Sequence, residues 1–441
     1  MDKIIKFFFI LMLSGCSFDN KTGIWENSNE VDLVKQKQFK DFETLYTVEK
    51  SFNEIIKPNK NLKISIDESY KILKWEQENL LETNNLVNFS YKDLNEIDFK
   101  SRKLSKYSVT ENILFDGNNL LLTDDKGNII VYSSENKKVI FKYNFYRKKY
   151  KKIKKILSTI IENNIIFVSD NLGYIYAIDY NSQRLIWAHN YKIPFRSNIK
   201  LLSKHLITSN QDNSLIILDK LTGERIKIIP TEETIIKNEF KNSIAVDQKS
   251  IYFLNTFGSL YSIDRKSLSI NWLVSLNENI DLNNNNLFYS NPIIANNNLI
   301  IVSTNPYLYI INGLTGVTIY KLPITSLVKP IIFKNNLFLV TNDNLLVCLD
   351  LKGKKVNYSI NIDEEIFNVV GKKKTITDPK YLFLVNQNLY LYLNENYTLN
   401  FSTTGKLKKI IKLKEKFKSS PIFINESIFY INKKNQLIVL N

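Results

Sequence analysis

The chain has 441 residues, of which 44% are hydrophobic and 12% aromatic, so it can bury a sizeable core. Its formal net charge of +16 would by itself favour a polyanionic partner. The excess of Lys, Asn and Ile indicates a compositional bias instead, and no basic motif with interleaved aromatic residues accompanies the charge. We therefore expect no nucleic-acid partner.

The first 16 residues have the pattern of a targeting segment. Two lysines make its start basic, and the apolar stretch from Ile4 to Leu13 is too short for a membrane-spanning helix, which needs about 20 residues. The stretch ends in Leu13-Ser14-Gly15-Cys16, which resembles the lipobox of bacterial lipoproteins. The resemblance implies that residues 1–15 are a signal peptide and that Cys16 is the lipid attachment site, acylated on its thiol and its new N-terminus. The alternative is an ordinary secreted protein with an incidental cysteine.

The residues after the lipobox predict a location and a tether. Residue 17 is Ser rather than Asp, which by the sorting rule of bacterial lipoproteins implies the outer membrane, with the protein facing the periplasm. Residues 16–60 are polar and carry no sustained period. We expect a flexible, lipid-anchored tether, with a root-mean-square span of roughly 35–40 Å if it is fully flexible.

From about residue 113 to the last residue, one pattern recurs eight times. Each copy is an apolar run that ends in a small polar residue, here called the anchor; the runs are 128–133, 174–179, 214–219, 259–264, 307–312, 345–350, 397–402 and 436–441. The anchors are spaced about 44 residues apart, a period typical of β-propellers with one four-stranded blade per repeat. The sequence therefore predicts an all-β, eight-bladed propeller of antiparallel blades over residues 61–441, with each run as a third strand.

The residues after the anchors also recur. Several anchors are followed by a Thr-Gly turn, and a bulky residue stands eight positions past five of them: Phe141, Trp187, Trp272, Tyr320 and Tyr358. Glycine is scarce, and Asn takes many turn positions, since it tolerates positive φ better than most residues. Four anchors are aspartates: Asp179, Asp219, Asp264 and Asp350. Because they recur at one structural position, we expect them to cap turns rather than to act in catalysis.

The last repeat stops at its anchor, Asn441, and lacks a fourth strand. An open edge of this kind would invite aggregation. The segment from Lys71 to Glu76 contains Trp75, which looks like the bulky residue of a fourth strand. We therefore expect this N-terminal strand to complete the last blade and close the ring.

The repeat resembles the pyrroloquinoline-quinone-type propeller repeat, as in Asp219-Lys220-Leu221-Thr222-Gly223 and in the spacing from Asp179 to Trp187. Lipobox, tether and eight such blades together resemble the B lipoprotein of the outer-membrane β-barrel assembly machine. That resemblance implies a scaffold without enzymatic activity or cofactor. Its implied partners are the barrel-forming subunit of the machine, unfolded outer-membrane proteins, and the outer membrane itself through the lipid anchor.

In better-known members of that family the docking loops lie in the middle blades. The aligned stretches here are Ile236 to Glu239 and Leu287 to Tyr289, and neither has the family's contact residues. We therefore expect docking through the same loops with a divergent surface, and we carry over no contact residue.

Quinone-dependent dehydrogenases share the repeat and are the alternative. They need a Ca²⁺ site of carboxylate and amide oxygens and a carboxylate base, and many carry a vicinal Cys pair. Here no such pair occurs, and Trp holds the bulky place in two of the seven fourth strands that follow an anchor. We predict no catalytic, cofactor-binding or metal-binding residue.

Three further features favour structural interpretations. His189 and His205 fall in neighbouring blades, but no Cys or paired carboxylate stands at ligand spacing, so we expect isolated histidines rather than a metal pair. Cys348 lies in an apolar strand and should behave as a small buried hydrophobe. The basic run 147–155 is either a solvated loop or a site for an acidic partner or anionic lipid.

Overall fold

The computed structural model describes residues 52–146, 150–233, 240–277, 287–370, 378–394 and 396–441, together with two short strands nearer the N-terminus. These are β1 (Ser17–Phe18) and β2 (Trp25–Glu26), which pair antiparallel. They belong to one unit, residues 1–52, and residues 53–441 form a second, compact unit. The predicted signal peptide and Cys16 lie outside the described residues. Residues 53–60, which we expected at the end of the tether, are part of the second unit.

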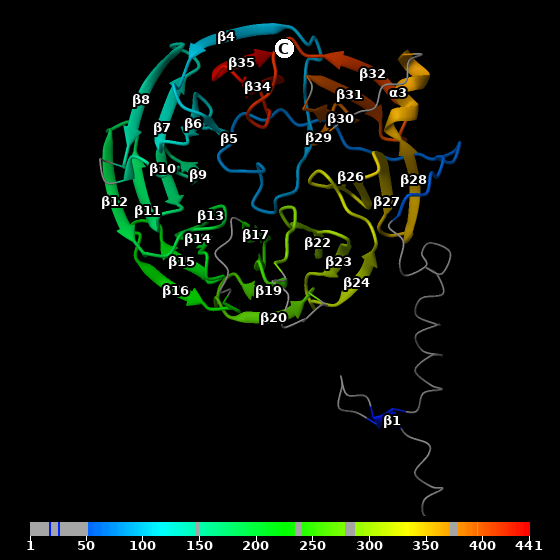
Figure 1. Cartoon of the computed structure of the whole chain (residues 1–441), viewed down its shortest axis with the longest axis horizontal. Helices are drawn as coiled ribbons and strands as arrows, with labels where there is room; N and C mark the ends of the chain where they lie inside the picture. Colours follow the sequence, from blue (N-terminus) through cyan, green and yellow to red (C-terminus); the bar gives the residue numbers. More distant parts are fainter. Residues whose placement is uncertain are drawn as a thin grey trace, which may run out of the picture. The chain divides into compact units, whose positions relative to one another are not determined.

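Residues 53–441 form a closed ring of eight sheets, as Figure 1 shows. Blade 1 consists of β5 (Val109–Phe115), β6 (Asn119–Asp124), β7 (Asn128–Ser133) and β8 (Lys138–Asn144). Blade 2 consists of β9 (Leu157–Glu162), β10 (Ile165–Asp170), β11 (Tyr174–Asp179) and β12 (Arg184–Asn190). Blade 3 consists of β13 (Lys200–Leu202), β14 (His205–Ser209), β15 (Leu215–Asp219) and β16 (Arg225–Ile229). Blade 4 consists of β17 (Ser243–Val246), β18 (Ser250–Leu254), β19 (Ser259–Asp264) and β20 (Ile270–Ser275).

The second half of the ring repeats the plan. Blade 5 consists of β21 (Ile294–Asn296), β22 (Leu299–Ser303), β23 (Leu308–Asn312) and β24 (Thr318–Leu322). Blade 6 consists of β25 (Ile331–Phe333), β26 (Asn336–Val340), β27 (Leu345–Asp350) and β28 (Lys355–Asn361). Blade 7 consists of β29 (Pro379–Val385), β30 (Asn388–Leu393), β31 (Tyr397–Ser402) and β32 (Leu407–Lys412), with the short β3 (Asn88–Phe89) added in parallel to β29. Blade 8 consists of β33 (Ile422–Ile424), β34 (Ser427–Ile431), β35 (Gln436–Leu440) and β4 (Ile97–Lys103).

The prediction of an eight-bladed propeller is confirmed, and every anchored run forms a third strand. All six residues of β7, from Asn128 to Ser133, are buried, because a central strand of a blade is covered by a neighbouring blade on each face. This two-sided burial explains why these strands read as continuous apolar runs rather than as alternating ones.

The turns depend on the residues that the sequence indicated. Several Asn residues have positive φ, among them Asn164, Asn298 and Asn435. The anchor Asp219 accepts hydrogen bonds from the backbone N–H groups of Leu221 (2.8 Å) and Thr222 (2.9 Å), and these bonds lower the pKa of its carboxyl. The anchors Asp179, Asp264 and Asp350 cap their turns in the same way. The prediction of turn-capping aspartates is therefore confirmed.

An N-terminal strand closes the ring, but the segment that we predicted for it is wrong. The closing strand is β4, which pairs antiparallel with β35 so that Phe99 stands opposite Val439. Phe99 contacts Tyr132 of blade 1 with ring centroids 6.4 Å apart, as a bulky fourth-strand residue should. Trp75 lies instead in the centre of the ring, where it is buried and bridges Phe115 of β5. A single aromatic residue in an extended segment does not distinguish the outer edge of a blade from its inner edge.

One helix stands out among the described residues, α3 (Ile362–Val370), between blades 6 and 7. Asn361 caps its N-terminus by accepting a hydrogen bond from the N–H of Asp363 at 2.9 Å. Ile362 and Ile366 face the core, whereas Phe367 is exposed.

Candidate protein-binding surfaces and a filled central channel

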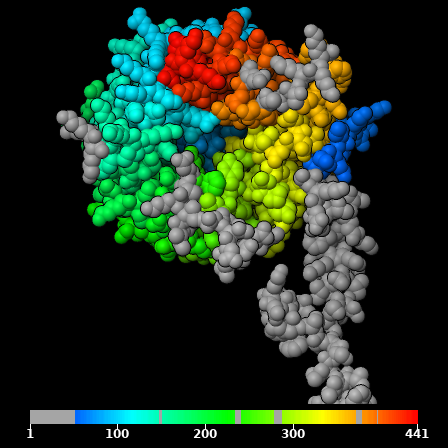
Figure 2. Space-filling view, in the orientation of Figure 1, coloured from blue at the N-terminus to red at the C-terminus, as the bar shows by residue number. Residues whose placement is uncertain are grey.

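The chain's own N-terminal region fills the centre of the ring. Residues 70–92, which we call the plug, precede β4 and cross the middle of the propeller as the blue trace in Figure 1. In the space-filling view the same blue atoms lie in the hollow at the centre of the ring (Figure 2). The channel that a propeller leaves on its axis is thus occupied by protein.

The plug is bonded to all eight blades. In blades 1 and 2, Trp75 exchanges backbone hydrogen bonds with Phe115 (2.7 and 2.8 Å), and Ile161 N–H donates to the Glu76 carbonyl (3.0 Å). Three more backbone N–H groups donate to plug carbonyls: that of Val246 in blade 4 at 2.9 Å, that of Ala295 in blade 5 at 3.0 Å and that of Asn425 in blade 8 at 2.8 Å. In blade 3 the Lys200 ammonium donates a hydrogen bond to the plug, and in blade 6 the Ile332 carbonyl accepts one from it. In blade 7, β29 pairs in parallel with β3 of the plug. Since neighbouring blades share this one segment, its contacts connect all the blades.

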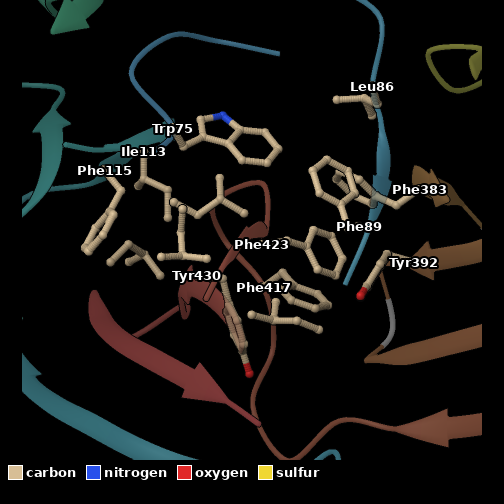
Figure 3. Close-up of a cluster of buried hydrophobic side chains, with 14 of the residues drawn as sticks. Trp75, Leu86, Phe89, Ile113, Phe115, Phe383, Tyr392, Phe417, Phe423 and Tyr430 are labelled. Atoms are coloured by element: carbon tan, nitrogen blue, oxygen red, sulfur yellow. The ribbon is translucent and has the colours of Figure 1, made fainter. Parts of the chain in front are cut away.

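Aromatic packing secures the plug on one side of the ring (Figure 3). The ring of Phe89 stacks on Trp75 with centroids 5.5 Å apart and on Phe423 of blade 8 at 4.7 Å, and it contacts Phe383 of blade 7 at 6.0 Å. All four side chains are nearly or fully buried. Aromatic side chains bury large apolar areas, so this cluster contributes strongly to holding the plug between blades 1, 7 and 8.

Asn84 is the polar centre of the plug. It is fully buried, and its amide N–H₂ donates to the Ile244 carbonyl (2.8 Å) and the Ile293 carbonyl (2.9 Å). Its amide oxygen accepts from the Lys200 ammonium at 2.7 Å. One side chain thereby connects blades 3, 4 and 5.

Two lysines point into the channel. Burial lowers the pKa of Lys200 to about 8, although the acidic side chains of the plug raise it in part. Burial and the nearby charge of Lys200 lower the pKa of Lys329 to about 7. The Lys329 ammonium donates to the Asn79 side chain (2.8 Å) and the Asn84 carbonyl (2.9 Å). These neutral oxygens compensate part of the cost of placing two ammonium groups in the channel.

A cavity of about 340 Å³ lies between the plug and blades 1, 5, 6, 7 and 8. Its wall carries both signs of charge, because Lys380 pairs with Glu111 at 2.9 Å and Lys329 lies near Glu78. Burial alone would raise the pKa of Glu111, but hydrogen bonds from Tyr381 and Lys380 lower it below its usual range. The cavity wall therefore balances its charges internally.

The face that carries the blade-to-blade connections also exposes large apolar side chains. Phe240, Tyr289 and Leu327 lie in the connections that precede blades 4, 5 and 6, and Phe257 lies in the turn between β18 and β19. Phe240 and Tyr289 contact each other with centroids 5.7 Å apart. We call these four residues the connection-face cluster. Strand order puts blade-to-blade connections and second-to-third strand turns at the same end of the blades.

The predicted docking stretches fall partly on this cluster. The stretch from Ile236 to Glu239 lies outside the described residues. In the stretch from Leu287 to Tyr289, Phe288 packs against the interior between blades 4 and 5, and Tyr289 is exposed. The sequence therefore pointed to one exposed residue of the cluster.

The other predicted residues lie in structural positions. His189 on β12 hydrogen-bonds the Thr222 carbonyl at 2.8 Å, and His205 begins β14 opposite Asp219. Within the described ranges no three His, Cys, Asp or Glu side chains are placed to hold a metal ion. Cys348 is buried in β27, and burial raises the pKa of its thiol to about 12.

Part of the basic run lies outside the described residues, namely 147–149. Of the remainder, Lys155 is buried, with its ammonium bonded to the carbonyls of Tyr150 and Ile153. This lysine therefore holds a turn together and is not a solvated charge. In addition, no helix in the described part of the chain is long and apolar enough to cross a membrane.

The plug is the structural element that the sequence did not predict. It has no repeat, and its one conspicuous residue, Trp75, suited an outer strand equally well. Lys329 and Lys200 could have indicated that a polar segment lies in the channel. Both stand at the start of short apolar first strands, where a charge needs a buried partner.

The comparisons with known proteins agree with this architecture. A family model described as outer membrane protein assembly factor BamB matches residues 75–291 and 147–359, which together span about two thirds of the chain. No curated protein matches the chain significantly.

Among solved structures, BamB from Moraxella catarrhalis superposes with a TM-score of 0.59 at 10% identity, covering 78% of this chain and 99% of that one. The quinohemoprotein alcohol dehydrogenase from Comamonas testosteroni gives a TM-score of 0.61 at 7% identity, covering 84% and 81%. The computationally designed Ika8 protein gives 0.57 at 10% identity, covering 77% and 98%. At such identities the likeness establishes the shared propeller fold.

Proposed function

Because the chain belongs to the family of the outer membrane protein assembly factor BamB, we propose that it is a non-enzymatic scaffold for outer-membrane protein assembly. In this proposal it assists the folding and insertion of β-barrel proteins. It is anchored to the outer membrane through lipid on Cys16 and faces the periplasm. Three acyl chains would make that anchor effectively permanent, since each buried CH₂ adds about 0.8 kcal/mol.

The filled channel supports a scaffold over a quinone-dependent dehydrogenase. A cofactor on the axis of the ring would have to displace the plug, which is bonded to every blade and packed through Trp75 and Phe89. The polar residues around the plug do not fit a Ca²⁺ and quinone pair either. The carboxylate Glu111 is committed to Tyr381 and Lys380, and the channel presents two lysines, Lys200 and Lys329.

The connection-face cluster is the surface that we assign to the barrel-forming subunit. Phe240, Phe257, Tyr289 and Leu327 combine exposed aromatic and aliphatic side chains, the composition expected of interface anchors. Their place in blades 4 to 6 agrees with the middle-blade docking that the family resemblance implies.

Retention of the barrel-forming subunit tests the proposal. The acylated protein is immobilised and exposed to detergent-solubilised outer membranes, and the retained proteins are identified. We expect the subunit to be retained by the native chain and by Phe367→Ala, an exposed control on α3, but weakly by the Phe240→Ala/Tyr289→Ala variant. Equal retention by all three would reject the assigned surface, and no retention by any would reject the partner.

The dehydrogenase alternative has its own measurement. Purified protein is heated with and without pyrroloquinoline quinone and Ca²⁺, where a ligand at 100 times its Kd would add about 2.7 kcal/mol to stability. We expect no shift in melting temperature. A clear shift together with alcohol-dependent dye reduction would overturn the scaffold assignment.

A further inference from the structure

The face that carries the blade-to-blade connections has opposite charges on its two halves. From the β14–β15 turn of blade 3 to the start of blade 7, the described turns and connections on this face are mostly acidic: Asp212, Glu232, Glu233, Asp343, Asp363, Glu364, Glu365 and Asp378, against Lys241 and Lys329. From the connection before blade 8 to the connection after blade 2 they are mostly basic, and these three blades are neighbours in the ring (Figure 1). A compositional bias toward lysine would affect both halves alike, so it does not explain the difference.

Nine exposed lysines make up the basic half. We call them the basic patch: Lys414, Lys416, Lys433, Lys434, Lys106, Lys151, Lys152, Lys154 and Lys192. Among the residues that the structure describes, none of the nine forms an ion pair with a carboxylate. The acidic residues in the described parts of the same turns and connections are Asp125 and Glu415, which are half-buried, and Glu415 pairs with Lys100. The charge of the patch is therefore largely uncompensated.

Hydrogen bonds between neighbouring segments make the basic patch continuous. Within blade 8, the Lys433 N–H donates to the Lys416 carbonyl at 3.2 Å. From blade 8 to the connection before blade 1, the Asn435 side chain donates to the Tyr107 carbonyl at 2.7 Å. The lysines of these two blades thus stand on turns that are bonded to each other.

The same network continues into blade 2. The Asp125 N–H donates to the Ser108 carbonyl, and the Lys155 N–H donates to the Asp125 carbonyl, both at 2.9 Å. The Asn171 side chain of blade 2 donates to the Lys154 carbonyl at 3.0 Å. Because Lys155 is buried and holds its turn together, the exposed lysines of that turn have a fixed place on the face.

Two side chains with apolar surface lie among the lysines. Tyr107 follows Lys106 and is 46% exposed, and Ile153 stands between Lys152 and Lys154 and is 45% exposed. Ammonium groups attract anionic headgroups, and tyrosine and aliphatic side chains favour the boundary between headgroups and acyl chains. The basic patch therefore has the composition of a surface that binds an anionic membrane.

An acidic protein partner would favour a different composition. Arginine binds a carboxylate through two parallel hydrogen bonds, and protein interfaces are depleted of lysine. The basic patch contains no arginine, and the neighbouring Arg196 is half-buried and donates to Gln211 at 3.4 Å. A second copy of the chain is disfavoured as well, because each copy has a net charge of +16.

We propose that the basic patch of blades 8, 1 and 2 docks on the surface of a membrane that contains anionic phospholipids. Each lysine near such a surface adds to the attraction, so the nine act cumulatively. The inference rests on the proposed function for the identity of the membrane, to which the lipid on Cys16 attaches the chain. The lipid keeps the protein at the membrane, and the patch determines which side of the propeller faces it. The connection-face cluster of blades 4 to 6 is left to the barrel-forming subunit.

The test measures binding to lipid vesicles without any other protein. One set of vesicles contains equal parts of phosphatidylglycerol and phosphatidylcholine, and the other contains phosphatidylcholine alone. The chain from residue 17 onward is used, because acyl groups on Cys16 would by themselves bind both sets. This chain keeps the compact unit of residues 53–441 whole. Bound and free protein are separated by flotation of the vesicles.

Two matched variants separate the basic patch from the overall charge. The patch variant combines Lys151→Ser, Lys152→Ser, Lys416→Ser and Lys433→Ser. The control variant removes four lysines that are equally exposed but lie in turns at the opposite end of the blades: Lys204→Ser, Lys249→Ser, Lys266→Ser and Lys352→Ser. Both variants lose the same net charge, and thermal melts establish that both fold.

We expect the native chain and the control variant to bind the vesicles with phosphatidylglycerol alike, and the patch variant to bind them at least about tenfold more weakly. Binding should be lost in about 1 M salt, where the Debye length is about 3 Å, and should be weak to phosphatidylcholine alone. Equal binding by the two variants, or binding that persists undiminished in about 1 M salt, would overturn the inference.

Hydrogen exchange locates the contact in the native sequence and needs no variant. Exchange should slow in residues 150–156 and 432–435 when the vesicles with phosphatidylglycerol are present, and it should not change in residues 264–268 at the opposite end of the blades. Protection of residues 264–268 with none in residues 150–156 would place the lipid on the other face and overturn the inference.

Two further outcomes assign the basic patch to another occupant and would also overturn the inference. If the patch variant differs from the control variant only in retention of the barrel-forming subunit, the occupant is an acidic protein surface. If the two differ only in self-association, it is a second copy of the chain. Vesicle binding through the patch, with no subunit retained by the native chain, would support the lipid surface and reject only the proposed partner.

Discussion

The indole of Trp187 in blade 2 lies directly against Gly223 of blade 3. A Cβ built on Gly223 would stand 2.6 Å from Cζ3 of the ring, and the indole N–H donates to the carbonyl of Lys220 at 3.2 Å. The same relationship recurs between Trp272 of blade 4 and Gly316 of blade 5. The bulky residue of one blade thus packs against the Thr-Gly turn of the next, which is why both recur in the repeat.

Gly223→Ala should destabilise the propeller. Gly223 has a φ of +73°, and the new Cβ would collide with the Trp187 ring, so strain and lost packing act together. We expect a loss of about 2–4 kcal/mol in the free energy of unfolding. Gly117→Ala is the control, because its φ is +110° but its nearest neighbour would be 3.5 Å away. In urea titrations, a loss in Gly223→Ala no larger than the roughly 1–2 kcal/mol that a left-handed backbone alone costs would contradict the role of the indole contact.

The contact between Trp187 and Gly223 also explains what could be predicted from the sequence. Blades are repeated units with the same local contacts, so anchors, turns and bulky residues recur and reveal the strand order. The closing strand and the plug occur once each and contact residues more than 200 positions away, as Asn85 contacts Ile332. No period marks such segments. Trp75 was therefore assigned to the wrong edge, and the partners of Asn84 could not be foreseen.

Cys16→Ala should abolish lipid attachment and leave the propeller folded. Residues 53–441 form their own compact unit, so their stability does not depend on an anchor. Metabolic labelling with a fatty acid should mark the native chain and Cys348→Ala, because Cys348 is buried in β27. The label should be absent from Cys16→Ala, whose thermal melt should match the native one. Labelling of Cys16→Ala at the native level would reject the lipoprotein proposal.

Stability should rise with pH between about 7 and 9. The pKa values of Lys200 and Lys329, lowered to about 8 and about 7 by burial, lie below the ordinary 10.5 of an unfolded lysine. In this window the unfolded chain holds more protons than the native one, so raising the pH favours the native state. His205 does not interfere, because burial lowers its pKa below 6.5.

Lys329→Met separates this effect from other titrations. The rise in melting temperature between pH 7 and pH 9 should be smaller in Lys329→Met than in the native chain. It should be unchanged in Lys249→Met, which alters an exposed lysine in the turn between β17 and β18. Identical slopes in all three proteins would show that Lys329 is charged to the same degree in the folded and the unfolded state.

Asn84→Gly should reveal how much the plug contributes to the closed ring. Asn84 has a φ of +61°, so Gly keeps the backbone relaxed and removes only the side chain. The Ile244 and Ile293 carbonyls and the Lys200 ammonium would each lose a partner in a buried site, and we expect a loss of about 2–4 kcal/mol. Asn298→Gly makes the same change at a φ of +62° in an exposed turn and should stay within about 0.5 kcal/mol of the native chain. Urea unfolding, followed by tryptophan fluorescence that includes Trp75 in the plug, measures both. If the two variants unfold at the same urea concentration, the side-chain bonds from the plug to blades 3, 4 and 5 do not stabilise the ring.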